Sequence, residues 1–178
     1  MTEEALMMLV KSGALENATA LFDLYNKRLY NFFVRITYDR DLGHDLTQNV
    51  FLRLIRFRHT YKEGSKFQSW IFQIARNVYA DHYRKHKVLK DNFVDVENIR
   101  QKIAAIDENI IKNEKEKQLH FALAKLKIEE REIIVLSKFQ EMKYEEIAAL
   151  LDCSLASVKV KVHRALKELK TSYFLLEE

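Results

Sequence analysis

The 178-residue chain contains no proline and only three glycines, and this scarcity constrains its fold more than any motif does. Sheet folds join their strands through frequent tight turns, which rely on these two residues. The composition therefore favours an all-α fold with few tight turns. Hydrophobic residues make up 48% of the chain and charged residues 31%, a balance typical of globular proteins. At this length the chain can form one large domain or two small ones.

Cysteine content and hydropathy narrow the class of protein further. The single cysteine, Cys153, excludes an internal disulfide and a metal site built from several cysteines. The sequence shows neither a signal-like N-terminus nor an apolar run of membrane length. We therefore expect a soluble, cytoplasmic protein that is not inserted into a membrane.

The net charge is only +4, but bases and acids are separated along the chain. Residues 52–90 contain ten Lys or Arg and two Asp or Glu, and residues 154–170 contain five bases and one acid. Between them, residues 91–118 contain seven acids and five bases. Two basic blocks around an acidic middle indicate two separate contacts with a polyanion.

In the first half, apolar residues recur at three- and four-residue spacings and predict helices over residues 3–10, 15–37 and 42–58. We expect the first helix to end near Gly13 and Asp41 to cap the third. The third helix has an apolar face formed by Leu46, Val50 and Leu54.

Residues 61–87 hold six aromatic and six basic residues against two acids. A loop over 60–66 precedes a helix that Ser69 can cap. The core face of this helix is formed by Ile71, Ile74, Ala75 and Val78, which leaves Trp70, Tyr79 and Tyr83 partly free. Rings among cations suit single-stranded nucleic acid, because bases stack on the rings and phosphates pair with the cations. An amphipathic core helix with a solvated basic side is the alternative.

Residues 88–117 lose the aromatics and gain acids, so we expect a linker with some local helix and weak tertiary anchoring. Its helical spacing rests on Ile99, Ile103, Ile106 and Ile110. The chain then divides into a domain over residues 1–90, an acidic linker over 91–117 and a second domain over 118–178.

The second domain has the pattern of a helix-turn-helix. Helices over 119–126 and 128–139 precede a short helix over 144–151, a turn at Asp152–Cys153 and a helix from Ser154 to about Leu169. Ser154 can cap the last helix, and Ala148 is small where the two helices must approach. The inner stripe of the last helix is Val158, Val162, Ala165, Leu166 and Leu169. Its outer face carries cations, as in a helix that enters the major groove. A plain helical hairpin with solvated lysines is the alternative.

In this order the motifs resemble those of small bacterial alternative sigma factors, the extracytoplasmic-function (ECF) group of the sigma-70 family. The segment DLGHDLTQNVFLRL, residues 41–54, looks like the family's helix that binds core RNA polymerase. KFQSWIFQIARNVYADHYRK, residues 66–85, looks like its promoter −10 helix. Residues 123–169, with SVKVKVHRA at their centre, look like its −35-binding domain. The resemblance covers nearly the whole chain and implies a sigma region 2 helical bundle followed by a sigma region 4 helix-turn-helix.

The sequence departs from the family's pattern at a few positions. Lys127 stands where Pro is frequent, and Glu141 and Lys143 stand where Gly and Ser are frequent. We therefore expect the helix from Tyr144 to lack a cap and to fray at its start. Within the last helix, Ala156 and Ser157 stand where Gly and Thr are common, and Val160 stands where a small polar residue is frequent. These three changes affect which −35 sequence the helix would prefer.

The resemblance implies a protein without catalytic chemistry, cofactor or metal. It would bind core RNA polymerase at the clamp helices of the largest subunit and at the beta flap, read the −35 element of promoter DNA and melt the −10 element. A base extruded from the −10 strand would lie at the Tyr61–Phe67 loop, and a cognate anti-sigma factor would regulate the protein. The implied core-polymerase contacts are Asp45, Gln48, Asn49, Phe51 and Arg53. The implied −10 contacts are Lys62, Lys66, Phe67, Trp70, Gln73, Arg76, Asn77 and Arg84. The implied −35 contacts are Ser157, Lys159, Val160, Lys161, His163, Arg164 and Lys167.

Two other functions are open from the sequence. A stand-alone helix-turn-helix regulator would bind an operator without polymerase and use the first domain as a sensor. A nucleic-acid enzyme is the third reading, but the sequence lacks a Gly-rich phosphate loop, a paired-carboxylate motif and a cluster of metal ligands. His82 and His86 are four residues apart and could share a metal, although phosphate-facing or solvated histidines suit so basic a segment better.

Overall fold

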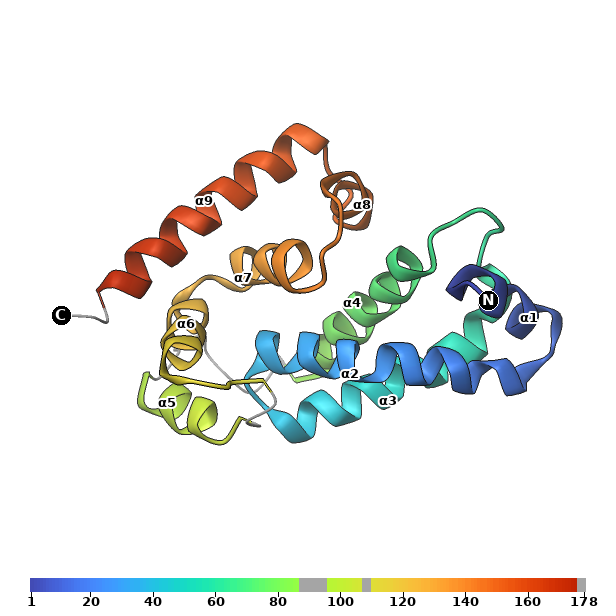
Figure 1. Cartoon of the computed structure of the whole chain (residues 1–178), viewed down its shortest axis with the longest axis horizontal. Helices are drawn as coiled ribbons and strands as arrows, with labels where there is room; N and C mark the ends of the chain where they lie inside the picture. The colour runs from blue at the N-terminus through green and yellow to red at the C-terminus, as the bar shows by residue number, and fades with distance from the viewer. Residues whose placement is uncertain (87–95, 107–109, 176–178) are drawn as a thin grey trace. The chain divides into compact units, whose positions relative to one another are not determined.

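The structure is a computed structural model that describes residues 1–86, 96–106 and 110–175 (Figure 1). These residues form helices and connecting turns, with no strand among them, so the predicted all-α fold is confirmed. The chain divides into two compact units. Unit 1 comprises Met1–Tyr30 and Asp41–Asp91, and unit 2 comprises Asn31–Arg40 and Asn92–Glu178.

Unit 1 is built from α-helices joined by short 3-10 turns. The α-helices are α1 (Glu3–Ser12), the first part of α2 (Ala18–Thr37), α3 (Arg40–Phe57) and α4 (Phe67–His86). The 3-10 turns are η1 (Leu15–Asn17) before α2 and η2 (Arg58–Thr60) after α3. Helix α1 ends as predicted, because Gly13 adopts a left-handed conformation (φ 110°) that closes its C-terminus.

Helices α2 and α3 pack against each other in opposite directions. The rings of Tyr30 and His44 stack with centroids 4.3 Å apart, and those of Phe22 and Phe51 lie 4.8 Å apart. Because the later residue of α2 meets the earlier residue of α3, the two helices are antiparallel. The predicted apolar faces of α3 and α4 are confirmed, since all of their residues are buried: Leu46, Val50, Leu54, Ile71, Ile74, Ala75 and Val78.

Three predicted helix starts in unit 1 are wrong by a few residues. The helix predicted from residue 15 begins as the 3-10 turn η1. Helix α3 begins at Arg40, so Asp41 lies within its first turn and does not cap it. Helix α4 begins at Phe67, so Ser69 lies inside it. The fully buried Phe67 draws the first turn of α4 onto the core, and this tertiary contact outweighs the capping preference of Ser69.

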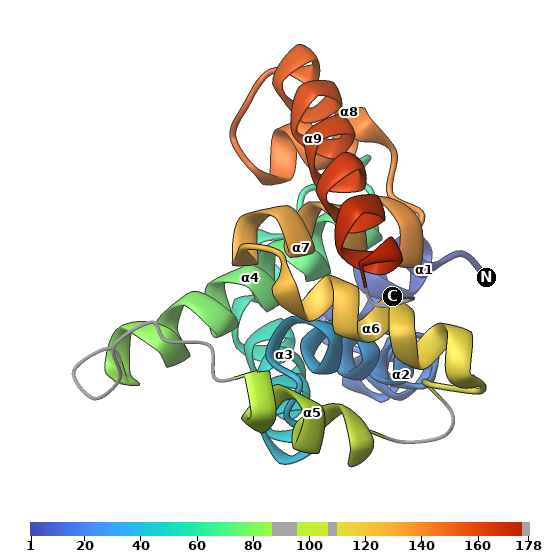
Figure 2. The same cartoon turned by 90° about the vertical axis from the view of Figure 1, so that its left-hand side faces the viewer.

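Unit 2 contains α5 (Val96–Ala104), α6 (Glu114–Lys125), α7 (Ile128–Ile134), α8 (Tyr144–Leu150) and α9 (Leu155–Phe174), with a π-helical turn η3 (Val135–Phe139) after α7. Helix α9 packs against α6, α7 and α8, as can be followed in Figure 2. The helices predicted from Ile128, Tyr144 and Ser154 are confirmed within one or two residues at their starts, while the end of the first widens into η3. Helix α6 begins five residues before the predicted Leu119.

Part of the predicted linker is anchored more firmly than its composition indicates. Helix α5 packs against α6, and Ile103, Ile106 and Ile110 are buried. The prediction of weak tertiary anchoring is therefore wrong for these three side chains. The side chain of Ile99 and residues 91–95 and 107–109 lie outside the described part of the chain.

Helices α7 and α8 start with the same capping contact. The Glu130 carboxylate accepts the backbone N–H of Lys127 (3.3 Å), and the Glu146 carboxylate accepts that of Lys143 (2.9 Å). Each acid lies three residues beyond the N–H that it accepts, which is one half of a capping box. Lys143 itself makes no side-chain cap, as predicted, but the Glu146 contact holds the start of α8 in place of the predicted fraying.

A buried arginine joins the helix ends of unit 2. The Arg131 guanidinium donates to the backbone carbonyl oxygens of Leu123, Ala124, Leu126 and Ile36, over 2.7–3.2 Å. It also lies 5.2 Å from the centre of the Tyr38 ring, and the Tyr38 hydroxyl donates to the His120 carbonyl (3.0 Å). Arg131 thus donates to carbonyl oxygens at the C-terminal ends of α2 and α6, where a positive charge is favoured; one of them, from Leu123, also accepts the Leu126 N–H (3.1 Å).

Candidate nucleic-acid interface

Helices α8 and α9 form the predicted helix-turn-helix in unit 2. After α8, Asp152 takes a left-handed conformation (φ 50°) and the Cys153 N–H donates to the Ala148 carbonyl (3.0 Å). The Ser154 hydroxyl then accepts the Ser157 N–H (3.1 Å), which confirms the predicted cap of α9. This short turn fixes the direction in which α9 leaves α8.

The inner stripe of α9 consists of residues spaced three and four apart. Val158, Val162 and Ala165 are buried, as predicted, and the stripe continues through half-buried Leu169 to buried Ser172. Leu166 is 36% exposed, so its assignment to the inner stripe is wrong. It follows Ala165 by about 100° around the helix and lies at the edge of the stripe.

The outer face of α9 carries the residues expected to contact the −35 element. Lys159, Val160, Lys161, His163, Arg164 and Lys167 are exposed, and Ser157 is half-buried. Val160 is 49% exposed and lies among the cations. Lys159, Lys161, Arg164 and Lys167 make no ion pair within the described part of the chain. Their charges are therefore available to a polyanion.

In unit 1 the loop before α4 has an exposed tip and buried ends. Lys62 and Lys66 are exposed, whereas Tyr61 and Phe67 are 1% and 0% exposed. Trp70, in the first turn of α4, is half-buried, and its ring lies edge-on to Tyr61 with centroids 5.3 Å apart. In this conformation Lys62, Lys66 and Trp70 can meet a ligand directly, while Phe67 supports the loop from beneath.

The remaining residues expected to contact the −10 element lie along the outer side of α4. The Gln73 amide donates to the Asn77 side-chain oxygen (3.3 Å), so these two side chains form a polar ridge beyond Trp70. Arg84 is exposed and its guanidinium lies 3.5 Å from the Asp81 carboxylate. Arg76 is half-buried on the neighbouring side of the helix.

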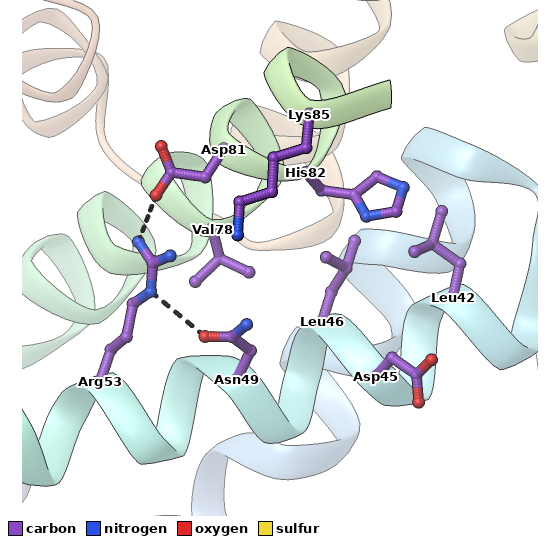
Figure 3. A pocket seen from close by; sticks show the side chains of 9 residues that line it. All are labelled: Leu42, Asp45, Leu46, Asn49, Arg53, Val78, Asp81, His82 and Lys85. Atoms are coloured by element: carbon purple, nitrogen blue, oxygen red, sulfur yellow. Dashed lines mark hydrogen bonds and ion pairs between the residues drawn. The ribbon is translucent and has the colours of Figure 1, made fainter. Parts of the chain in front are cut away.

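A pocket of about 260 Å³ lies between α3 and α4 (Figure 3). Helix α3 lines it with Leu42, Asp45, Leu46, Asn49 and Arg53, and α4 lines it with Val78, Asp81, His82 and Lys85. Three of the five residues expected to contact polymerase thus share one pocket wall. The other two lie elsewhere on α3: Gln48 is exposed, and Phe51 is half-buried against Phe22.

The pocket has a polar rim and an apolar floor. Arg53 donates to the Asn49 side-chain oxygen (3.2 Å) and to the Asp81 carboxylate (2.7 Å), and these contacts are drawn in Figure 3. The hydrogen bond from Arg53 is the main cause that lowers the pKa of Asp81, and the charges of Arg53, Arg84 and Lys85 add to it. Asp81 therefore stays ionised and holds Arg53 in place across the rim.

One residue of this surface is absent from the sequence-based set of contacts. Leu52 is 71% exposed and lies on the same outer side of α3 as Asp45, Gln48 and Asn49. A single exposed apolar side chain is ordinary on a protein surface, so Leu52 joins the candidate surface only by its position beside these polar residues. The signal was present in the sequence, because Leu52 lies outside the spacing of the buried residues Leu46, Val50 and Leu54.

No group of three or more His, Cys, Asp or Glu side chains in the described part of the chain could hold a metal ion. The His86 side chain lies outside the described residues, so the His82–His86 pair is not described. No helix among the described residues is long and apolar enough to cross a membrane.

Comparison with known families identifies both units. The family model described as sigma-70 region 2 matches residues 21–88, and that described as sigma-70 region 4 matches residues 116–169. The chain thus combines a sigma region 2 bundle with a region 4 helix-turn-helix, and it belongs to the sigma-70 family.

The ECF sigma factor SigX of Bacillus subtilis is 30% identical over 92% of this chain and 87% of its own length. CarQ of Myxococcus xanthus, an RNA polymerase sigma factor, is 30% identical over 90% of this chain and 91% of its own length. The chain is accordingly an ECF-type alternative sigma factor, a class that directs promoter-specific transcription initiation.

Two solved structures share the fold. The sigma factor RpoE of Bartonella quintana, in complex with the anti-sigma factor NepR, matches with a TM-score of 0.71 at 22% identity, over 86% of this chain and 94% of that one. CnrH, in complex with the cytosolic domain of CnrY, matches with a TM-score of 0.73 at 21% identity, over 98% of this chain and 97% of that one. This fold therefore also occurs in proteins whose structures were solved together with a partner protein.

Proposed function

We propose that the outer face of α9 reads the −35 element, that α4 and its preceding loop read and open the −10 element, and that the outer side of α3 docks on core polymerase. The observation that carries this proposal is the outer face of α9, where six of the seven candidate contacts are exposed and the cations make no ion pair among the described residues. A helix of this kind fits the major groove. Region 4 is then residues 118–178, region 2 is residues 1–90, and residues 91–117 connect them.

Each side chain of the α9 face has a role that its chemistry supports. Arg164 can donate two parallel hydrogen bonds to a guanine, and Val160 can contact a thymine methyl group. Lys159 and His163 complete the base-edge candidates, with Ser157 beside them at the start of the helix. Lys161 and Lys167 lie toward phosphates, so they add affinity but no sequence information.

The −10 element is opened at α4. Extruding one base costs a few kcal/mol, and stacking a base on an aromatic ring returns about 1–3 kcal/mol. One pocket at the 61–66 loop, beside Trp70, therefore roughly balances one extruded base. Lys62, Lys66, Arg76 and Arg84 hold the strand by its phosphates, and Gln73 and Asn77 face the edge of the duplex. Phe67 acts from beneath, as a buried support of the loop.

The polymerase surface is the outer side of α3 together with the pocket that it shares with α4. Asp45, Asn49 and Arg53 supply polar contacts there, and Gln48, Leu52 and Phe51 extend the surface around the helix. Its partner is the clamp-helix segment of the largest subunit, while region 4 binds the beta flap. Asp45→Arg reverses the charge of an exposed side chain and is expected to weaken core binding without unfolding unit 1.

The protein is proposed to act in the cytoplasm, without catalysis of its own, under the control of an anti-sigma factor. RpoE and CnrH, which share its fold, were both captured with a partner, and NepR is named as an anti-sigma factor. A cognate anti-sigma protein that covers the α3 surface or the α9 face would silence the factor by competition.

Two assays on the full chain test the proposal. Pull-down with core polymerase, followed by run-off transcription from a promoter library, is expected to give a defined −35 and −10 preference. The alternative, a stand-alone helix-turn-helix regulator, predicts DNA binding in the absence of polymerase and no retention by the core enzyme. Failure of the wild-type chain to bind core polymerase would reject the proposed function.

A further inference from the structure

Helix α1 lies outside residues 21–88, which match sigma-70 region 2, yet it contacts both sides of the 61–66 loop. It packs against η2, which precedes the loop, and against α4, which follows it. Leu6, Met7 and Val10 are buried in these contacts, so α1 is a fixed part of unit 1. Its polar side chains then reach the two ends of the loop.

The first end of the loop is held by Lys11. Its ammonium donates to the backbone carbonyl of Tyr61 (2.5 Å) from a half-buried position. The Tyr61 hydroxyl donates in turn to the Ser65 carbonyl, and the Ser65 N–H donates to the Lys62 carbonyl (3.1 Å). The loop is thereby closed on itself, so a shift of the Tyr61 backbone would carry its tip along.

The second end of the loop is held through two aromatic rings. Glu3 accepts a hydrogen bond from the Tyr25 hydroxyl, and the Tyr25 ring lies edge-on to Phe67 with centroids 5.0 Å apart. Burial, followed by the hydrogen bond to Glu3, raises the pKa of Tyr25 above its ordinary value, so the hydroxyl remains a donor. Phe67 is fully buried and starts α4, where the loop ends.

Glu3 and Lys11 are eight residues apart, which on an α-helix is about 12 Å. One rigid helix thus braces both buried ends of a loop whose tip, formed by Lys62, Glu63, Gly64 and Lys66, is exposed. A binding pocket selects its ligand only when the elements that form it are held in place. We propose that α1 positions the 61–66 loop and thereby sets the base selectivity of the −10 element, with Lys11 and Glu3 as positioning residues. This inference rests on the proposed role of the loop in holding an extruded base.

The test compares −10 base preference among full-length variants in run-off transcription from promoters that differ at single −10 positions. Lys11→Met removes the donor but keeps the aliphatic stem, and Lys11→Arg retains a donor. Lys27→Met is the matched control, because Lys27 is exposed on α2 and makes no polar contact within the described residues. Tyr25→Phe, which keeps the ring on Phe67 but loses the bond to Glu3, tests the second brace independently.

Lys11→Met is expected to lower discrimination at one −10 position about two- to tenfold, the range for loss of one hydrogen bond. Tyr25→Phe should lower it at the same position, Lys11→Arg should restore it, and Lys27→Met should leave it unchanged. Core affinity and −35 preference should stay as in the wild type. Unchanged −10 discrimination in both Lys11→Met and Tyr25→Phe would overturn the inference. A loss of core binding in Lys11→Met would also overturn it, because Lys11 would then serve the stability of unit 1.

A loop variant separates failure of this inference from failure of the proposed function. Lys62→Ala/Glu63→Ala/Lys66→Ala changes the exposed tip and leaves the buried Tyr61 and Phe67 in place. If the loop variant alters −10 preference while the α1 variants do not, only the positioning role is wrong. If the loop variant itself leaves −10 preference unchanged, the loop does not read the −10 element, and the inference falls with that assignment.

Discussion

Arg53 on α3 and Asp81 on α4 form an ion pair of 2.7 Å, and the other oxygen of Asp81 lies 3.5 Å from Arg84. Arg53 belongs to the proposed polymerase surface and Arg84 to the proposed −10 surface. One carboxylate therefore orients an arginine of each surface. This shared contact directly connects the two proposed surfaces of unit 1.

Asp81→Ala is expected to weaken core binding and promoter opening together, because it frees both arginines. The free energy of unfolding should fall only slightly, because both partners of the Arg53–Asp81 pair are still partly open to solvent, which screens their attraction. Core affinity can be measured by fluorescence anisotropy and opening by permanganate reactivity of −10 thymines. Asp23→Ala, which removes an exposed acid of α2, is the control. A loss of opening with unchanged core affinity would show that the two surfaces act independently.

Arg53→Ala and the Arg53→Ala/Asp81→Ala double variant sharpen this test. If Asp81 acts on core binding by orienting Arg53, the double variant should bind core polymerase no more weakly than Arg53→Ala alone. Additive losses would mean that Asp81 contacts polymerase itself.

Helical periodicity predicted most of the buried core, but it did not predict which aromatic side chains are exposed and able to contact nucleic acid. In α4 the three- and four-residue spacing of Ile71, Ile74 and Val78 located the buried face correctly. The sequence predicts that the extruded base lies at the Tyr61–Phe67 loop and that Phe67 contacts the −10 element, yet Tyr61 and Phe67 are almost wholly buried. Their environment comes from α1 and α2, which are distant in sequence, and no local pattern encodes it.

The same limit applies to charged residues. Arg131 lies between acids in EEREII, and its charge is typical of a surface residue, but it is buried against four backbone carbonyls. One of these, from Ile36, is 95 residues away in sequence. Such a position is set by where helices end in space. By contrast, the Ser154 cap and the α8–α9 turn depend on neighbouring residues, and the sequence predicted them.

Arg164→Ala is expected to relax base choice at one −35 position and to cost about 1–3 kcal/mol there, because a bidentate contact to guanine is lost. The measurement is competition binding of holoenzyme to −35 variants at fixed salt. Lys161→Ala should instead weaken all promoters equally and lower the salt dependence by about one counterion. Unchanged −35 preference in Arg164→Ala would remove this residue from the base contacts.

Trp70→Ala is expected to impair promoter opening strongly while core binding is kept. Its ring is half-buried against Tyr61, with centroids 5.3 Å apart, so the variant also loses about 1–2 kcal/mol of stability. Trp70→Phe keeps a ring for stacking and should retain most of the opening measured by permanganate. Loss of core binding or unfolding in Trp70→Ala would assign the ring to the core of unit 1.

His120 gives unit 2 a pH-dependent stability. The side chain is buried, and desolvation of the charged imidazole lowers the pKa of His120 from 6.5 to about 4. The charge of Arg35 also lowers this pKa, and that of Glu116 raises it. Its Nδ1 atom is buried and has no hydrogen-bond partner. Because the folded pKa is the lower one, the unfolded chain binds a proton between pH 6.5 and 4 that the folded chain does not. Stability is therefore complete above pH 6.5 and falls as pH is lowered through this window, by up to about 3 kcal/mol.

His120→Phe is expected to remove this component, because phenylalanine keeps the ring packed near Tyr38 and does not titrate. Between pH 7 and 5 the wild type should lose about 2 kcal/mol more stability than His120→Phe. Hydrogen exchange of peptides from α6 and α7 in urea measures the unfolding free energy of unit 2 at each pH, without a contribution from the unfolding of unit 1. His59→Phe, which changes an exposed histidine of unit 1, should keep the wild-type pH dependence. If His120→Phe and the wild type lose equal stability, then His120 does not stay neutral in the folded chain, and carboxylates such as Glu116 account for the acid sensitivity of unit 2.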